Sequence, residues 1–148
     1  MSDFRKLSET MLASPQIGPD EVATAAEQGV KLIVNNRPDG ESPDEPQGPE
    51  IEAAAAAAGI GYLAIPIGQS GFSLPQVDAL VEAIKSADGP VLGYCRSGTR
   101  STFLWSLARA KMGDAPEAIA AAAGAAGYDI SPVRPTVDML AGDASGDS

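Results

Sequence analysis

The fold of this 148-residue chain is decided by residues 91–101, which read Val91-Leu92-Gly93-Tyr94-Cys95-Arg96-Ser97-Gly98-Thr99-Arg100-Ser101. The first four residues form a short apolar run that is typical of a buried strand. Residues 99–112 follow with apolar side chains at helical spacing. The sequence therefore predicts that Cys95 lies between the end of a buried strand and the first turn of a helix.

The same alternation of strand and helix patterns extends along the chain. Further strands are predicted at 30–36 and 61–67, with a short edge strand at 16–18 inside a leader of residues 1–18. Other helices are predicted at 19–28, 50–58, 74–87 and 116–126, with a last short one inside 131–140. Such alternation predicts an α/β fold of three layers, in which a mostly parallel central sheet is flanked by helices. We expect one catalytic domain over residues 1–141 and a flexible acidic tail over 142–148.

Composition excludes several classes of function. The chain has no His and a single Cys, so histidine-based triads, histidine general bases and Cys/His metal sites are ruled out, and no metal or other cofactor is expected. The net charge of −10 disfavours nucleic acid and anionic membrane surfaces as partners. No apolar run is long enough to span a bilayer, and the first residues lack an apolar signal core, so a cytoplasmic protein is expected.

The residues after the predicted strand suit a reactive cysteine that works without imidazole. Free N–H groups at a helix start bind anions and favour the thiolate form of a cysteine. Gly98 allows a tight turn, and Arg100 adds a planar cation beside the bound anion. The hydroxyls of Ser97, Thr99 and Ser101 are expected to donate to the thiolate or to cap the helix. Arg96 completes this predicted anion-binding loop and is expected to point outward.

A second polar loop follows the strand predicted at 30–36. Ligands of parallel sheets bind beyond the carboxyl ends of the strands, so this loop is expected near Cys95. Asp39 is a candidate catalytic acid and a candidate clamp that holds Arg37 or Arg100 in place. Glu41, in the same loop, is the other candidate carboxylate. Arg37 is expected to support the groups that touch substrate without touching it itself.

Residues 94–101 resemble the active-site loop of rhodanese sulfurtransferases and the anion-binding loop of cysteine-dependent phosphatases. Wider matches resemble a bacterial family, the beta-lactamase hydrolase-like protein, phosphatase-like domain family, whose members are also called sulfur transferases. These matches are Leu7-Ser8-Glu9, Ser14-Pro15-Gln16-Ile17, Val34-Asn35-Asn36-Arg37-Pro38-Asp39-Gly40-Glu41 and Ile65-Pro66-Ile67. The resemblance covers roughly residues 3–113 and implies a cysteine-phosphatase-like fold. It also implies a functional partner, a metallo-hydrolase that handles persulfides.

Three functions are compatible with this loop. The first expectation is a sulfurtransferase that takes sulfane sulfur from a small donor as a Cys95 persulfide and passes it to an acceptor thiol. The alternative is a phosphatase-type hydrolase that cleaves a phosphate ester through a Cys95 phosphocysteine. The third is an anion- or persulfide-binding module without catalysis. Sulfur transfer is favoured for two reasons: four residues separate Cys95 from Arg100, one fewer than in tyrosine phosphatases, and residues 66–71 hold no carboxylate to act as a general acid.

Overall fold

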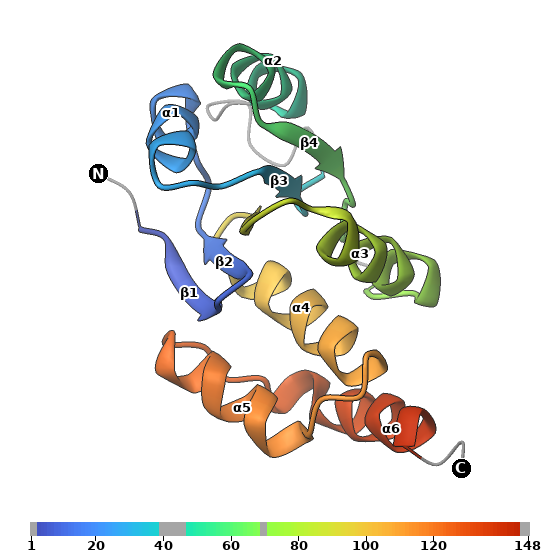
Figure 1. Ribbon diagram of the computed structural model, residues 1–148. Helices are drawn as coiled ribbons and strands as arrows, with labels where there is room; N and C mark the ends of the chain where they lie inside the picture. Colours follow the sequence, from blue (N-terminus) through green and yellow to red (C-terminus); the bar gives the residue numbers. More distant parts are fainter. Residues whose placement is uncertain (1–2, 39–46, 69–70, 146–148) are drawn as a thin grey trace.

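The computed structural model describes residues 3–38, 47–68 and 71–145 of the chain. Helices flank a central five-stranded sheet (Figure 1). The strands are β1 (Arg5–Ser8), β2 (Met11–Ser14), β3 (Leu32–Asn35), β4 (Gly61–Ala64) and β5 (Val91–Tyr94). The helices are α1 (Pro19–Glu27), α2 (Gly48–Ala58), α3 (Leu74–Ser86), α4 (Thr99–Lys111), α5 (Pro116–Ala125), the short 3-10 helix η1 (Ser131–Val133) and α6 (Arg134–Ser145).

The sheet has the order β1-β2-β5-β3-β4, so β5 occupies its centre. β5 runs parallel to both β2 and β3, and β4 runs parallel to β3, whereas β1 pairs with β2 in the antiparallel sense. All four residues of β5 are buried, as expected for a central strand covered on both faces. The predicted α/β fold with a mostly parallel sheet is thus confirmed, and the chain leaves the middle of the sheet directly into Cys95.

Two predictions about the ends of the chain were wrong. Residues 16–18 form no strand, because Pro15 has no N–H to donate and Gly18 already caps α1; the strands of this region are β1 and β2. The last helix, predicted as a short one inside 131–140, continues as α6 to Ser145. Leu140 and Ala141 are buried and hold this last part of α6 against the protein.

The helices lie in layers on the two faces of the sheet. α1 and α2 cover one face, α3 and α4 cover the other, and α5 and α6 pack against the outer side of α4 (Figure 1). On the α1–α2 side, Ile33 of β3 and Leu92 of β5 share a core with Val22 and Ile51. On the other side, Val34 and Val91 belong to the larger core. Successive strand residues thus point to opposite faces, as the pleat requires.

α4 is the central helix of the molecule, since it is enclosed by β2, β5, α3, α5 and α6. Its buried residues are Ser101, Thr102, Leu104, Trp105, Ser106, Leu107, Ala108 and Ala110. The buried hydroxyls of Thr102 and Ser106 donate to the carbonyl oxygens four residues earlier, at 2.9 and 2.8 Å, which satisfies them inside the helix. Because packing fixes α4 on all these sides, the position of its first turn is fixed as well.

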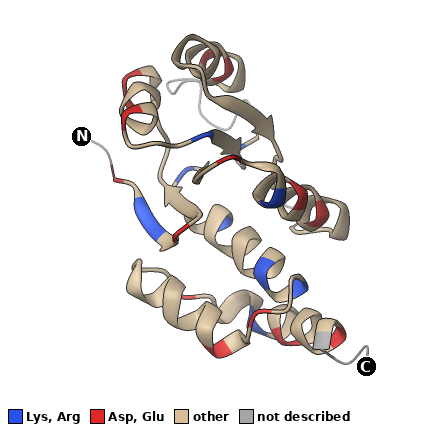
Figure 2. Cartoon of the chain, viewed as in Figure 1, with Lys and Arg blue, Asp and Glu red and all other residues tan. Residues whose placement is uncertain are grey.

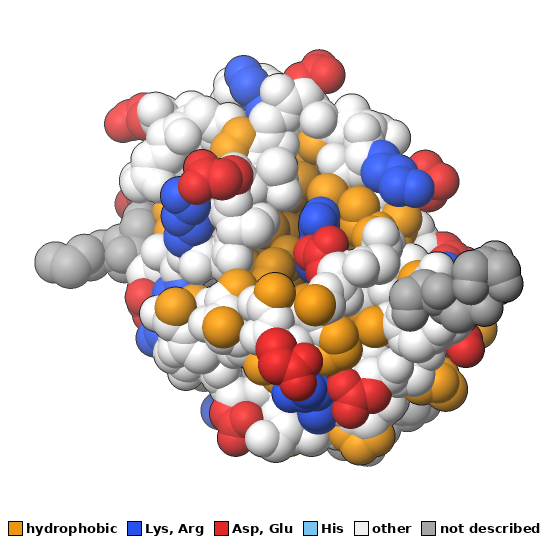
Figure 3. All heavy atoms as spheres, turned by 60° about the horizontal axis from the view of Figure 1, so that its bottom comes forward, with side chains coloured by type: hydrophobic (Ala, Val, Ile, Leu, Met, Phe, Trp, Pro, Cys, Tyr) orange, Lys and Arg blue, Asp and Glu red, His pale blue; other side chains and the backbone are white. Residues whose placement is uncertain are grey.

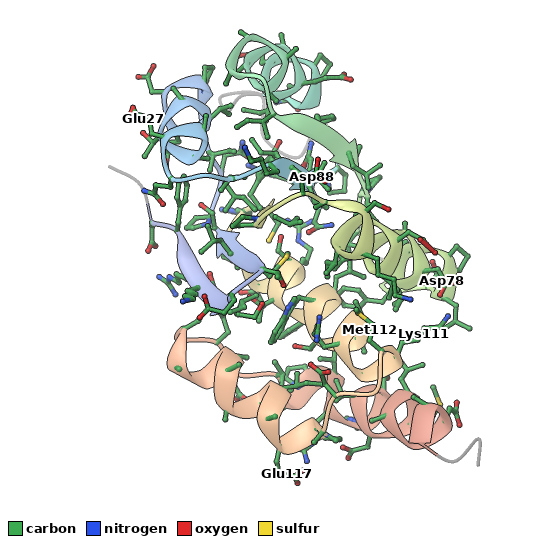
Figure 4. All side chains as sticks on the ribbon, in the orientation of Figure 1. Glu27, Asp78, Asp88, Lys111, Met112 and Glu117 are labelled. Carbon is green, nitrogen blue, oxygen red and sulfur yellow. The ribbon has the colours of Figure 1, made fainter. Side chains whose placement is uncertain are left out.

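Ion pairs join α4 to its surroundings at the far end from Cys95. Lys111 of α4 lies against Asp78 of α3, and the two side chains point toward each other (Figure 4). α4 carries three basic residues and no Asp or Glu (Figure 2); the basic residues are Arg100, Arg109 and Lys111. Of these three residues, Arg100 lies in the first turn beside Cys95, whereas Arg109 and Lys111 lie in the last turn and pair with Asp114 and Asp78.

The face formed by α5 and α6 mixes hydrophobic side chains with such pairs (Figure 3). Arg109 contacts Asp114 at 2.8 Å, and Arg134 contacts both Glu117 and Asp138. Exposed ion pairs add little stability, so the attachment of α5 and α6 to α4 rests on apolar packing. Among the described residues, no helix is both long enough and apolar enough to cross a bilayer.

Candidate active site

The segment that carries Cys95 is attached to the residues that follow β2. The N–H of Cys95 donates to the carbonyl of Ser14 at 3.3 Å, and the N–H of Gln16 donates to the carbonyl of Arg96 at 3.2 Å. These two bonds continue the parallel pairing of β2 with β5 beyond the end of the sheet. The start of the loop is therefore an extension of the sheet, and the Cys95 side chain is fully buried.

The sulfur of Cys95 accepts a backbone hydrogen bond from inside the loop. The N–H of Gly98 donates to Sγ at 3.1 Å. Gly98 is also the N-cap of α4, and its φ of 90° lies in the left-handed region that favours glycine. Sγ thus lies at the positive end of a 13-residue helix with an N–H directed at it, an arrangement that stabilises a thiolate and a bound anion.

Arg100 in the first turn of α4 reaches across to the segment after β4. Its Nη1 donates to the carbonyl of Ile67 at 2.9 Å, and the side chain is partly buried. This bond fixes one edge of the guanidinium relative to the loop. A planar cation fixed in this way suits recognition of a tetrahedral oxyanion above the helix N-terminus.

The hydroxyls of the loop bond to one another, to the start of α4 and to Asn36. Ser97 Oγ donates to Thr99 Oγ1 at 2.9 Å and accepts from the Thr99 N–H, so these two residues form an exposed turn. Ser101 Oγ donates to Asn36 Oδ1 at 2.8 Å in a buried contact. In the part of the chain that the structure describes, none of the three bonds to the sulfur, whereas Ser97 Oγ accepts from an N–H in the first turn of α4, as the predicted capping role requires. These residues shape the loop through one another.

Arg37 supports the loop through an intermediary. Its side chain is buried, and Nη1 donates to Gln16 Oε1 at 2.8 Å, while the Gln16 N–H holds the Arg96 carbonyl. Arg37 was predicted to support the substrate-binding groups without touching substrate, and its bond to Gln16 connects it to the loop in that way. The Arg96 side chain is exposed, in the outward position that the sequence predicted. Asp39 and Glu41 lie outside the described residues.

Asn36 is a buried residue of the site for which sequence reasoning predicted no role. Its Nδ2 donates to the Ile65 carbonyl at 2.9 Å, and its Oδ1 accepts from Ser101. It therefore joins the ends of β3 and β4 to the first turn of α4. An Asn at the end of a buried strand was the available signal, since a buried amide needs partners.

Tyr128, which follows α5, was also missed. Its hydroxyl donates to the Ser97 carbonyl at 3.1 Å, and the Arg5 guanidinium stacks over its ring at 5.0 Å. Burial raises the pKa of Tyr128 above its ordinary value; the Arg5 charge opposes that rise, and the charge of Cys95 adds to it. No pattern in the sequence links a tyrosine at this position to a loop some thirty residues earlier.

Comparison with known proteins gives a consistent match over most of the chain. The family model described as beta-lactamase hydrolase-like protein, phosphatase-like domain, matches residues 3–112. A beta-lactamase hydrolase-like protein of Xylella fastidiosa (strain Temecula1) is 36% identical over 101 residues, which cover 68% of this chain and 23% of that protein. A protein of the same name from Agrobacterium fabrum is 35% identical over the same shares. This chain therefore spans less than a quarter of the length of these relatives.

Solved structures share the fold. A crystal structure from Neisseria meningitidis, described as a candidate phosphatase, is 32% identical, with a TM-score of 0.83 over 95% of this chain and 99% of that one. TpbA of P. aeruginosa is 20% identical, with a TM-score of 0.68 over 97% of this chain and 91% of that one. A TpbA variant in complex with pTyr, at 19% identity and a TM-score of 0.67, covers 97% of this chain and 90% of that one. The last two show similarity of fold alone, and that fold is the cysteine-phosphatase-like one predicted from the sequence.

Proposed function

Since this chain belongs to the beta-lactamase hydrolase-like protein, phosphatase-like domain family, we propose that it is a cysteine-dependent hydrolase of phosphate monoesters with Cys95 as its nucleophile. The observation that carries the proposal is the Gly98 N–H directed at the buried Cys95 Sγ, 3.1 Å away, at the N-terminus of α4. The 32% identity to a Neisseria protein described as a candidate phosphatase supports the same reaction class. This order of preference reverses the one drawn from the sequence, where sulfur transfer came first.

The reaction proceeds in two displacements at phosphorus. The Cys95 thiolate attacks the phosphorus atom, a sulfur–phosphorus bond forms, and the bond from phosphorus to the ester oxygen breaks. The departing oxygen takes up a proton. Water then attacks the phosphocysteine, the sulfur–phosphorus bond breaks, and inorganic phosphate leaves with the thiolate restored. The Gly98 N–H and the N-terminal end of α4 stabilise the thiolate in the first and last states.

Arg100 has the role of holding the equatorial oxygens of the phosphoryl group. Charge spreads over these oxygens in the transition state, so a cation fixed in advance lowers the barrier. The bond from Arg100 Nη1 to the Ile67 carbonyl supplies that fixation. Proton delivery to the leaving oxygen is assigned to Asp39 or Glu41, because residues 66–71 contain no carboxylate.

Sulfur transfer remains the second candidate, and the length of the loop favours it. Four residues lie between Cys95 and Arg100, and a shorter cradle suits a single sulfur atom on Cys95. In that reaction the thiolate attacks the sulfane sulfur of a donor, the donor's sulfur–sulfur bond breaks, and the donor leaves as an anion without a general acid. An acceptor thiolate then removes the sulfur. A persulfide-handling metallo-hydrolase would be the functional partner of such an enzyme.

Acid-quench mass spectrometry distinguishes the two reactions. Because Cys95 is the one cysteine of the sequence, a mass gain on a cysteine is assigned to it without ambiguity. After incubation with an aryl phosphate we expect a gain of one phosphoryl group, release of phosphate, and loss of both in Cys95→Ser. Incubation with thiosulfate or glutathione persulfide tests the competing reaction, sulfur transfer.

The two arms give opposite results for the two candidates. A gain of one sulfur atom with a persulfide donor, together with absence of phosphate release, would establish sulfur transfer and overturn the proposal. Anion binding without either covalent product would indicate a binding module. Circular dichroism of Cys95→Ser shows whether the fold is retained, so that loss of turnover reports on the nucleophile.

A further inference from the structure

We propose that Tyr128 is a positioning residue for the Cys95 loop, which sets the direction of the Gly98 N–H by holding the other end of the same peptide unit. The inference rests on the proposed function only in taking Cys95 as the reactive group. Tyr128 follows α5 and lies beyond residues 3–112, the range that the family model matches.

The geometry of one peptide unit carries this inference. The peptide bond between Ser97 and Gly98 is planar, and with the trans arrangement found here its C=O and N–H point in opposite directions. The Ser97 carbonyl accepts from the Tyr128 hydroxyl at 3.1 Å, and the Gly98 N–H donates to Cys95 Sγ at 3.1 Å. Rotation of this unit would break both bonds together. Fixing the carbonyl therefore directs the N–H at the sulfur.

The same hydrogen bond strengthens the donor. A carbonyl that accepts a hydrogen bond polarises its peptide unit, and the N–H of that unit then becomes a better donor to the next acceptor. Two hydrogen bonds are thus linked in series: the Tyr128 hydroxyl donates to the Ser97–Gly98 peptide unit, and that unit donates to the Cys95 sulfur. Its effect is largest when the sulfur is a thiolate, because hydrogen bonds to charged acceptors are the stronger ones.

Close packing keeps the peptide unit in this orientation. A Cβ added at Gly98 would lie 2.2 Å from the Tyr128 hydroxyl and 3.2 Å from the backbone carbon of Ser14. The loop thus runs between Tyr128 on one side and the end of β2 on the other. Glycine at this position allows the tyrosine hydroxyl to approach the backbone closely enough to bond it.

Tyr128 itself is fixed from two sides. The chain turns after α5 with the Tyr128 N–H bonded to the Ala123 carbonyl at 2.9 Å. Above the ring, the guanidinium of Arg5 stacks at 5.0 Å, and its Nη1 donates to the Ala126 carbonyl at 3.5 Å. Tyr128 is 8% exposed. A side chain restrained in this way places its hydroxyl at a fixed point beneath the loop.

The test replaces Tyr128 with Phe and observes the Gly98 amide directly. In ¹⁵N-labelled Tyr128→Phe we expect the Gly98 amide proton to move upfield and to exchange with solvent up to about tenfold faster, since its bond to sulfur weakens. Alkylation of Cys95 by iodoacetamide at neutral pH should slow, and kcat/KM for an aryl phosphate should fall about tenfold. The amide signals do not depend on turnover, so they test the inference even if the proposed function fails.

Tyr62→Phe is the matched control. Tyr62 is a partly buried tyrosine whose hydroxyl accepts from Asn35 Nδ2 at 3.0 Å, on the edge strand β4. Loss of the Tyr62 hydroxyl should leave the chemical shift and exchange rate of the Gly98 amide unchanged, as well as the rate of Cys95 alkylation. An unaltered Gly98 amide in a folded Tyr128→Phe protein would overturn the inference, whatever happens to turnover.

A second measurement needs no substitution and covers the case in which Tyr128→Phe does not fold. Vanadate added to the unsubstituted protein mimics a bound phosphoryl group. Because Tyr128 and the Gly98 amide contact opposite ends of one peptide unit, their resonances should shift together, with the same vanadate dependence. A Gly98 shift that leaves the Tyr128 ring signals unmoved would refute the coupling.

Discussion

Residues 3–112 and residues 113–145 contribute to the same site in different ways. The first region, which the family model matches, supplies Cys95, the loop after it and Arg100. The second region supplies α5 and α6, which pack against α4, and Tyr128, which bonds the loop from below. The proposed reactive groups therefore lie in one region, whereas the proposed positioning of the loop depends on both. A family model that contains the proposed nucleophile need not contain the residues that orient the loop around it.

The largest effect within the first region is expected from Arg100→Ala. Because we propose that the Arg100 cation stabilises transition-state charge, its removal should lower kcat for an aryl phosphate about 100- to 1,000-fold. Arg100→Lys should recover part of that loss, because it keeps the charge but not the planar donor pair. Steady-state kinetics at saturating substrate measures both variants.

Arg96→Ala is the control for this experiment. Arg96 has the same charge and lies in the same loop, but its side chain is exposed. Its loss should change kcat less than threefold, as an exposed and screened charge would. Equal losses in the two variants would mean that net charge alone matters and that the fixed position of Arg100 does not.

Gly98→Ala tests where the two regions meet, and its effect is expected to be intermediate. The left-handed backbone at φ 90° costs about 1–3 kcal/mol for a residue with a side chain. The new methyl group would also collide with the Tyr128 hydroxyl. We therefore expect a loss of unfolding free energy beyond the backbone term, measured by urea denaturation, together with reduced turnover.

Gly113→Ala separates the two causes. Gly113 has a φ of 100°, but nothing lies within 4 Å of a Cβ added there, so this variant carries the backbone strain alone. The difference between the two variants reports the collision with Tyr128. Tyr128→Phe introduced into Gly98→Ala should recover part of that difference, because it removes the nearest atom. Identical losses for both glycines would argue against tight packing between the regions.

The sequence predicted those parts of the fold that depend on local pattern. The strand 91–94 was predicted with its correct bounds, and the strands and helices between residues 19 and 126 were located within a few residues, because buried strands and amphipathic helices have distinct periods. The β1–β2 hairpin was missed, since its strands have four residues each and Lys6 and Ser8 interrupt the apolar pattern. Helix α6 was predicted too short, because Gly142 and Asp143 resemble a terminus unless the burial of Leu140 and Ala141 is known.

Less of the candidate site than of the fold could be predicted from the sequence. The sequence predicted that Cys95 precedes a helix start and that Gly98 allows a tight turn there, and the structure adds which N–H bonds the sulfur, that of Gly98. The bond from a loop hydroxyl to the sulfur, one of the two roles expected, is not seen among the described residues, where Ser97 bonds Thr99 and Ser101 bonds Asn36, since a short hydroxyl bonds whichever acceptor the fold brings near. Gln16, Asn36 and Tyr128 reach the loop from three other segments. Contacts of that kind depend on tertiary packing, and no local period encodes them.

The smallest effect is expected from the titration of Tyr128 at alkaline pH. Burial holds the pKa of Tyr128 above its ordinary value of 10.0, with Arg5 acting against that rise and the charges of Cys95 and Asp3 adding to it. The folded protein therefore binds this proton more tightly than the unfolded chain does. The resulting contribution to stability is complete below a pH of about 10 and is lost as the pH rises through the pKa of folded Tyr128.

Thermal unfolding midpoints of the unsubstituted protein and of Tyr128→Phe, followed from neutral pH to about pH 11, isolate this contribution, because all other titrating groups are common to both. We expect the two curves to keep a constant separation up to about pH 10 and then to converge, as the unsubstituted protein loses the stabilisation that Phe never had. Convergence would mean that the folded protein favours the protonated Tyr128 hydroxyl, as burial of this side chain requires. Curves that stay parallel throughout would mean that the pKa of Tyr128 is the same in the folded and unfolded chain, and the contribution of Tyr128 to stability would then be one of shape alone.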